Sequence, residues 1–316
     1  MIENDVLNQL KWMSQTFILH PEFEQALKGI RGCMERSIAY GEPVGSLCYG
    51  AGGMGKSSVC RAIIEQFPRY QHAHKDCIKT IVPVFYIEVP SPATVKSVAG
   101  SMLQALGDPT PLAGTAAHMT KRLCYLLTQC ETKLVFLDEF HHLFDRQKKS
   151  SHLNITIANW IKTLVNETKI SFCLVGLPEF VPLLEIDSQL SRRFQYHFQL
   201  NPLKLGINSQ GTMIPFMQEI AYQTLEKMEI DFQPHLSDPI FAQQIYIATH
   251  GNYAYVMSLI RECLVMAIAD QRQTVTRQDF SHVWQQGITA YVCLSKKDPF
   301  QMTEYQLASY LKDIDQ

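Results

Sequence analysis

The stretch Gly50-Ala51-Gly52-Gly53-Met54-Gly55-Lys56-Ser57 decides the fold of this chain. It matches the pattern G-x-x-x-x-G-K-[ST], follows the apolar run 46–49 and precedes a helical stretch over 58–67. Such glycines let backbone N–H groups surround a β-phosphate, and the helix start adds its positive dipole end. This context argues against a chance Gly-rich turn. We expect the loop and Ser58 to bind ATP, with Lys56 on the β- and γ-phosphates and Ser57 on Mg²⁺.

Apolar runs recur around this loop and predict a sheet. They are rich in Val, Ile, Phe and Tyr, do not alternate cleanly, and cover residues 46–50, 82–89, 134–138, 170–176 and 195–200. Strands buried on both faces have this pattern. Because the intervening stretches are long enough for helices, we predict an α/β core with a five-stranded parallel sheet.

The hydrophobic pattern changes after Pro202. Amphipathic helical patterns replace the apolar runs there and cover residues 214–228, 239–248, 253–270 and 277–286. We therefore predict an N-terminal helical segment (1–42), an α/β core (43–202), a small α-helical lid (203–288) and a C-terminal tail (289–316).

Composition favours a cytoplasmic protein. The net charge is −2, which excludes a general attraction for polyanions. Long apolar segments and signal-peptide features are missing, so we expect no membrane partner. The nine cysteines show no C-x-x-C spacing, which favours a reducing compartment and argues against structural zinc.

A second motif follows the third apolar run, which ends in Asp138-Glu139. Ligands of open α/β sheets bind at the carboxyl ends of the strands. We expect Asp138 to orient Mg²⁺ through water and Glu139 to polarise the attacking water as general base. The alternative is a solvated strand end.

With these motifs the chain resembles the AAA+ superfamily, and more closely the TnsC/TniB family of transposition ATPases. The resemblance covers about residues 20–290 and rests on three stretches: Asp138-Glu139-Phe140-His141-His142-Leu143, Leu174-Val175-Gly176-Leu177-Pro178-Glu179 and Asp187-Ser188-Gln189-Leu190-Ser191-Arg192-Arg193-Phe194. It implies an AAA+ core, ATP and Mg²⁺ as ligands, and assembly into a ring or helical filament.

The resemblance also implies a role for Arg192 or Arg193, which precede the last apolar run. An arginine there reaches the γ-phosphate held by a neighbouring subunit in AAA+ proteins. A guanidinium suits this role because it stays charged and bonds two oxygens at once. The alternative is a surface arginine pair.

Two departures from the AAA+ pattern predict slow hydrolysis. The polar sensor that ends the fourth strand is missing from Val175-Gly176-Leu177-Pro178. In the lid, Tyr255 stands where an arginine is common, and Asn252 is the candidate to replace it.

The pair His141-His142 invites a metal interpretation. Adjacent histidines do not share one face of a helix, and the sequence offers no evident third ligand. We expect them instead to line the segment after the active strand and contact phosphate or a neighbour.

Candidate DNA contacts come from the resemblance alone. Lys96 and Thr115 match positions that face the central pore of TnsC assemblies, and Lys121 and Arg122 follow on the next helix. The alternative is a solvated helix face with an N-cap.

Together these features predict an ATP-dependent regulator of transposition that assembles on duplex DNA without regard to sequence. The resemblance implies that it links a target-selecting protein to the transposase. One alternative is a replication initiator or helicase loader, although the segment after residue 288 is short for a DNA-reading domain. The other is a signalling NTPase without DNA binding, whose ATPase rate and sedimentation DNA would not change.

Overall fold

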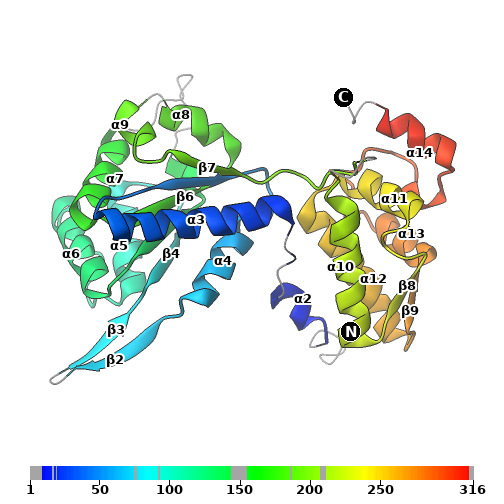
Figure 1. Ribbon diagram of the computed structural model, residues 1–316, viewed down its shortest axis with the longest axis horizontal. Coiled ribbons are helices and arrows are strands. Elements are labelled where there is room, and N and C mark those ends of the chain that lie inside the picture. The colour runs from blue at the N-terminus through cyan, green and yellow to red at the C-terminus, as the bar shows by residue number, and fades with distance from the viewer. Residues whose placement is uncertain are drawn as a thin grey trace. The chain divides into compact units, whose positions relative to one another are not determined.

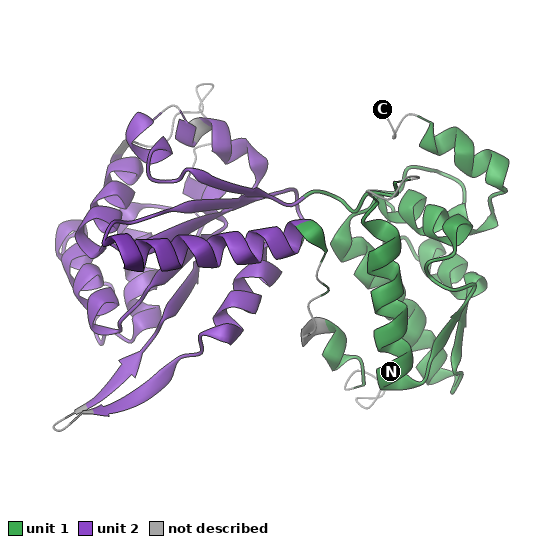
Figure 2. Ribbon diagram, viewed as in Figure 1, with its two compact units in different colours: residues 1–21, 53–55, 201–316 green, residues 22–52, 56–200 purple. Residues whose placement is uncertain are grey.

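The computed structural model describes residues 9–15, 18, 20–74, 77–91, 93–143, 155–185, 187–206 and 211–312. Contacts divide the chain into two compact units (Figure 2). Unit 2 comprises residues 22–52 and 56–200, and unit 1 comprises residues 1–21, 53–55 and 201–316. The short segment 53–55 therefore clusters with the C-terminal unit although it lies within the glycine-rich loop.

Unit 2 is built on a five-stranded parallel sheet, which confirms the predicted fold class. Its order is β4-β5-β6-β1-β7, with bounds β1 Ser46–Tyr49, β4 Val84–Glu88, β5 Leu134–Asp138, β6 Ser171–Gly176 and β7 Tyr196–Gln199. Every residue of β5 and β6 is buried, as expected of central strands with helices on both faces. Residue Tyr49 pairs with Gly176, and Glu88 pairs with Asp138, so the carboxyl ends of four strands meet at one edge.

Helices surround this sheet (Figure 1). They are α3 Pro21–Tyr40, α4 Lys56–Gln66, α5 Val95–Leu106, α6 Ala116–Gln129, α7 Ile155–Thr168, α8 Val181–Glu185 and α9 Ser188–Ser191, with 3₁₀ turns η1 Phe140–Leu143 and η2 Pro178–Phe180. Local signals fix their ends. A capping box between Thr94 and Ser97 starts α5, and Gly107 in the left-handed conformation ends it.

An antiparallel hairpin outside the main sheet separates α4 from β4 and was not predicted. It consists of β2 Tyr70–His74 and β3 Cys77–Ile81, which extend away from the sheet (Figure 1). Tyr70 and Ile78 are exposed on it. Midway along it, Lys79 forms a 2.9 Å ion pair with Glu131, which lies beyond the end of α6.

Unit 1 is mainly helical and has its own apolar core. Its helices are α2 Lys11–Gln15, α10 Met213–Met228, α11 Pro239–Thr249, α12 Tyr253–Ala269, α13 Arg277–Gln285 and α14 Glu304–Leu311, with the 3₁₀ turn η3 Pro299–Gln301. Two short strands, β8 Asp231–Gln233 and β9 Thr274–Thr276, pair in parallel, although the sequence predicted only helices here. Within the described residues no single helix is long and apolar enough to cross a membrane; only α11 and α12 together, bent by 113°, pass that test.

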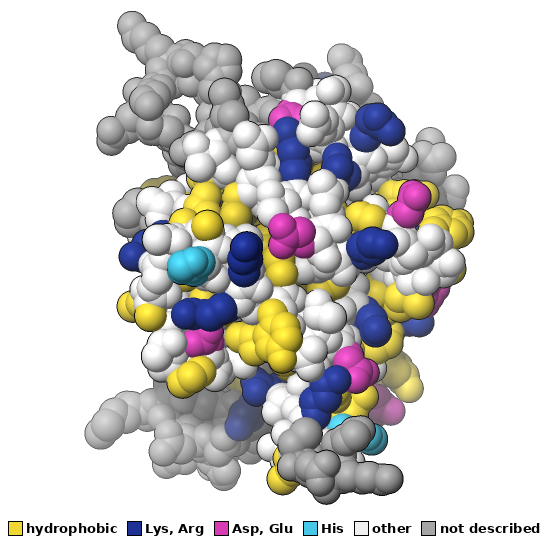
Figure 3. Space-filling model, turned by 90° about the vertical axis from the view of Figure 1, so that its left-hand side faces the viewer, with side chains coloured by type: hydrophobic (Ala, Val, Ile, Leu, Met, Phe, Trp, Pro, Cys, Tyr) yellow, Lys and Arg dark blue, Asp and Glu magenta, His cyan; other side chains and the backbone are white. Residues whose placement is uncertain are grey.

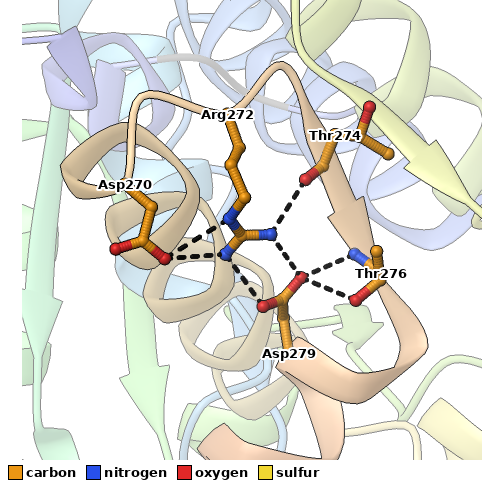
Figure 4. A network of polar contacts seen from close by, with 5 residues as sticks. All are labelled: Asp270, Arg272, Thr274, Thr276 and Asp279. Atoms are coloured by element: carbon orange, nitrogen blue, oxygen red, sulfur yellow. Dashed lines mark hydrogen bonds and ion pairs between the residues drawn. The ribbon is translucent and has the colours of Figure 1, made fainter.

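A polar network joins α12, β9 and α13 (Figure 4). The guanidinium of Arg272 donates to both carboxylate oxygens of Asp279 at 2.9 and 3.0 Å, and to the carbonyl of Thr274. Asp279 in turn accepts from the backbone and hydroxyl of Thr276, closing a capping box at the start of α13. This bidentate pair ties the turn that precedes β9 to the first turn of α13.

Candidate active site

The glycine-rich loop follows the carboxyl end of β1, which lies between β6 and the edge strand β7. Gly50 is required there, because a Cβ atom at this position would lie only 2.3 Å from the carbonyl oxygen of Leu200. Gly55 adopts a φ of +86°, a conformation that glycine takes without strain. Beneath the loop, burial raises the pKa of the Cys48 thiol to about 12, so this cysteine is an unreactive core residue at neutral pH.

The glycine-rich loop and the acidic motif after β5 meet where the carboxyl ends of the strands lie. Lys56 is buried, and its Nζ donates to the carbonyl oxygens of Gly50 and Ala51 at 2.8 and 2.9 Å. The hydroxyl of Ser57 donates to Oδ2 of Asp138 at 2.8 Å. A hydroxyl beside a carboxylate is an oxygen donor set that suits Mg²⁺. The structure thus places the Ser57 hydroxyl on the Asp138 carboxylate and the Lys56 ammonium on the loop carbonyls, and the roles of these residues toward ATP and Mg²⁺ stay predictions.

Tyr86, on β4, is a partner of Asp138 that sequence reasoning missed. Its hydroxyl donates to Oδ2 of Asp138 at 2.8 Å. Burial, and then this hydrogen bond, raise the pKa of Tyr86 well above its usual range, so it remains a donor at all physiological pH values. A tyrosine inside an apolar run gives no sign of this role, because only the pairing of β4 with β5 places it beside the acid.

Glu139 directly follows β5 and has an unusual backbone. Its φ is +53°, and the other five non-glycine residues with positive φ in the described part each follow a helix. Left-handed residues that lack such a helix end are enriched at functional sites. The backbone N–H of Glu139 donates to Oδ1 of Asp138 at 2.8 Å, which fixes the turn and separates the two carboxylates.

Both histidines after Glu139 lie close to it, which differs from the sequence analysis. Nδ1 of His141 is 3.2 Å from Oε2 of Glu139, and the rings of His141 and His142 are 4.5 Å apart. The residues occupy a 3₁₀ turn rather than an α-helix, so the argument from helix faces does not apply. The Glu139 carboxylate therefore lies beside both imidazoles, which the spacing argument did not consider.

Gly176, the last residue of β6, lies close to both 3₁₀ turns, η1 and η2. A Cβ atom on Gly176 would lie 3.1 Å from the ring of Phe180 and 3.4 Å from the backbone nitrogen of His141. A larger side chain at this position would require the Phe180 ring of η2 to shift by a few tenths of an ångström, whereas the contact with His141 is an ordinary one.

The structure distinguishes the two arginines before β7. Arg193 donates through Nε and a terminal nitrogen to Oδ1 of Asn166 and through the other terminal nitrogen to the carbonyl of Gln189. Arg192 is exposed, and within the described part of the chain its guanidinium makes no hydrogen bond or ion pair.

The four candidate DNA contacts lie on α5, α6 and the turn between them. Lys96 and Lys121 are exposed. Thr115 is the N-cap of α6, where its Oγ1 accepts from the backbone of His118, which leaves its hydroxyl proton to donate elsewhere. The guanidinium of Arg122 forms a 3.0 Å ion pair with Asp108 and donates to the carbonyls of Thr110 and Ala113. Arg122 therefore holds the turn between α5 and α6 in place.

In unit 1, Asn252 caps α12 by accepting from the backbone nitrogens of Ala254 and Tyr255. The nitrogen of Ala254 also lies 3.0 Å from the carbonyl oxygen of Gly53, to which it donates. A Cβ on Gly53 would come within 2.6 Å of Oδ1 of Asn252, which explains a glycine there. The Asn252 carboxamide therefore has a structural role at the helix start.

Replacing Lys56 by alanine is expected to weaken ATP binding by about 10- to 150-fold, the value of losing one hydrogen-bonded charge. Calorimetric titration of both proteins with Mg·ATP measures this. Lys28→Ala, which removes an exposed lysine on α3, is the matched control. Equal affinities of the parent and Lys56→Ala would contradict the assignment.

Solved structures with a similar fold are P-loop AAA+ ATPases. The Orc1 protein of Aeropyrum pernix in complex with DNA has a TM-score of 0.57 and 17% identity, over 85% of this chain and 66% of that one. Cdc6p from Pyrobaculum aerophilum has a TM-score of 0.61 and 14% identity, over 94% of this chain and 86% of that one. The ORC2 protein of Aeropyrum pernix with ADPNP and ADP has a TM-score of 0.58 and 13% identity, over 90% of this chain and 70% of that one. The chain spans just under two thirds of the Orc1 chain.

Sequence comparison identifies the family. No curated protein matches the chain. The profile of the family described as Bacterial TniB protein matches residues 9–204, which is well over half of the chain and includes the loop, the acidic motif and the arginine pair. Together with the parallel sheet and the meeting of Ser57 with Asp138, this match shows that the chain belongs to the TniB family, with the fold of the AAA+ ATPases.

Proposed function

We propose that the chain is an ATPase that regulates DNA transposition. The observation that carries the ATPase part is the 2.8 Å hydrogen bond between Ser57 and Asp138, which unites the phosphate loop with the acidic strand end. The family assignment and the resemblance to TnsC support the transposition part.

In the proposed reaction, Lys56 turns from the loop carbonyls to the β- and γ-phosphates, and the loop N–H groups hold the β-phosphate. Ser57 and Asp138 would hold Mg²⁺, and the bound ion would neutralise charge on the phosphates. The Tyr86 hydroxyl, which donates to the same Oδ2 atom as Ser57, keeps the Asp138 carboxylate oriented. Glu139 takes the proton of the attacking water. We propose slow turnover, because Gly176 supplies no sensor at the end of β6.

Arg192 completes the site of a neighbouring subunit in this proposal. Its guanidinium is exposed, whereas Arg193 is held by Asn166 and Gln189 and keeps the preceding helix in place. ATP would therefore favour assembly, since a bound γ-phosphate gives Arg192 of the next subunit a ligand.

Duplex DNA is the proposed partner of the assembly. Figure 3 shows Lys and Arg side chains scattered among acidic and apolar ones on one face of the molecule, without a single large basic patch. Affinity would then come from a few contacts repeated in every subunit, namely Lys96, Thr115 and Lys121, with Arg122 holding the turn. Such contacts bind phosphates and read no bases. We further propose that the assembly links a target-selecting protein to the transposase.

The test is a DNA-binding titration with a non-hydrolysable ATP analogue at several salt concentrations. Lys96→Ala should weaken binding and flatten the dependence of log affinity on log salt by about 0.9 for each phosphate that the lysine no longer neutralises. Lys28→Ala, an exposed lysine paired with Glu24, is the control. Parental affinity and slope in Lys96→Ala would contradict the DNA contact. If DNA changes neither the ATPase rate nor sedimentation of the parent, the signalling alternative is correct.

A further inference from the structure

We propose that Glu139, His141 and His142 form a binding site for a divalent transition-metal ion, best represented by Zn²⁺, and that the bound ion stops hydrolysis by occupying Glu139. One ligand atom from each residue lies within 4.8 Å of those of the other two. All three residues are partly buried: Glu139 lies between β5 and the 3₁₀ turn η1, and both histidines lie in that turn. The inhibition rests on the proposed role of Glu139, but the binding site itself does not.

The spacing between Glu139 and His141 fits a shared ion. Zinc bonds to histidine nitrogen and carboxylate oxygen are about 2.0–2.2 Å long, so two ligands at the tetrahedral angle lie about 3.3–3.5 Å apart. Nδ1 of His141 and Oε2 of Glu139 are 3.2 Å apart. An ion between them would need little movement of either side chain.

His142 has the second contact that is typical of a metal ligand. Its Nδ1 lies 3.0 Å from the carbonyl oxygen of Val89, and a carbonyl can only accept, so Nδ1 carries the proton. The lone pair is therefore on Nε2, which becomes the ligand atom. Metal-binding histidines usually donate their other ring nitrogen to a carbonyl or carboxylate in this way, which fixes the tautomer and the ring orientation.

The donor set selects the class of ion. Two imidazoles and one carboxylate suit zinc and its first-row neighbours, whereas Mg²⁺ and Ca²⁺ prefer oxygen ligands. The Mg²⁺ ligands proposed above are separate from this cluster, because the Asp138 carboxylate bonds to Ser57, Tyr86 and the backbone of Glu139. Zinc would leave the phosphate loop intact and remove only the base.

Binding is measured first on the full chain without nucleotide, by competition between the protein and a chromophoric zinc chelator. Removing a residue that merely hydrogen-bonds a metal ligand typically costs about 10- to 100-fold in affinity, so His141→Ala and His142→Ala should each cost at least as much. His118→Ala, an exposed histidine on α6, should bind zinc like the parent. Parental affinity in either ligand variant would overturn the site.

A measurement on the unaltered chain guards against misfolded variants. Cobalt(II) replaces zinc in nitrogen and oxygen sites and reports its ligands in its visible spectrum. Bound cobalt without thiolate charge-transfer bands supports the cluster, and such bands would overturn it in favour of cysteine ligands.

Inhibition is then tested with Mg·ATP present. Zinc should lower the ATPase rate of the parent while nucleotide affinity stays the same, and the fractional inhibition should be smaller in His142→Ala. Displacement of nucleotide by zinc, or equal inhibition of both proteins, would overturn the regulatory part. If Glu139→Gln retains full ATPase activity, the proposed base is wrong, whereas zinc binding in the absence of nucleotide still decides the metal site.

Discussion

Arg192→Ala is expected to lower the ATPase rate of the assembled protein by about 10³-fold or more, the usual contribution of an arginine that stabilises the charge of a transferring phosphoryl group. ATP binding by the separate subunit should be unchanged, because Arg192 lies before β7 and acts on the site of a neighbour. Steady-state hydrolysis and calorimetric ATP titration of the same protein measure the two quantities.

Arg193→Ala is the matched control for this prediction. It removes the hydrogen bonds to Asn166 and Gln189, so it should lower the thermal stability of unit 2 more than Arg192→Ala does. Mixing Arg192→Ala with Lys56→Ala should restore part of the activity, since the second protein donates its arginine to the intact nucleotide site of the first. An absence of rescue at every ratio, with both proteins folded, would argue against a shared site.

Glu139→Gln is expected to reduce the rate of hydrolysis by about 10²- to 10⁴-fold, the range for losing a general base. ATP binding should persist, because glutamine keeps the shape of the side chain and leaves Ser57 and Asp138 in place. The variant should therefore hold its assembled state on DNA, which sedimentation with ATP measures.

Glu131→Gln is the matched control for this variant, because Glu131 has the same positive φ of 53° but follows α6 at the surface. It should hydrolyse ATP like the parent. Parental turnover in Glu139→Gln would show that another group activates the water.

The main sheet could be predicted from sequence because its strands are buried on both faces. The runs 134–137 in β5 and 172–175 in β6 are uniformly apolar, so the pattern marks both strands clearly. The phosphate loop was equally clear from its glycine spacing. The structure shows why one of these glycines is needed, because the Leu200 carbonyl approaches Gly50 closely.

What was missed depends on contacts between distant residues or on unusual backbone. The strand β2 reads Tyr-Gln-His-Ala-His and is outside the sheet, so it has no apolar pattern. The difference between Arg192 and Arg193 depends on Asn166, which lies in α7. The cluster around Glu139 requires both its positive φ and the 3₁₀ turn, and neither is encoded in the spacing of Glu139, His141 and His142.

The hairpin of β2 and β3 has an evolutionary consequence. It is inserted between α4 and β4 and adds no strand to the sheet, so its length and surface chemistry can diverge among relatives without disturbing Lys56, Asp138 or Glu139. Selection can therefore act on this appendage and on the nucleotide chemistry as independent traits.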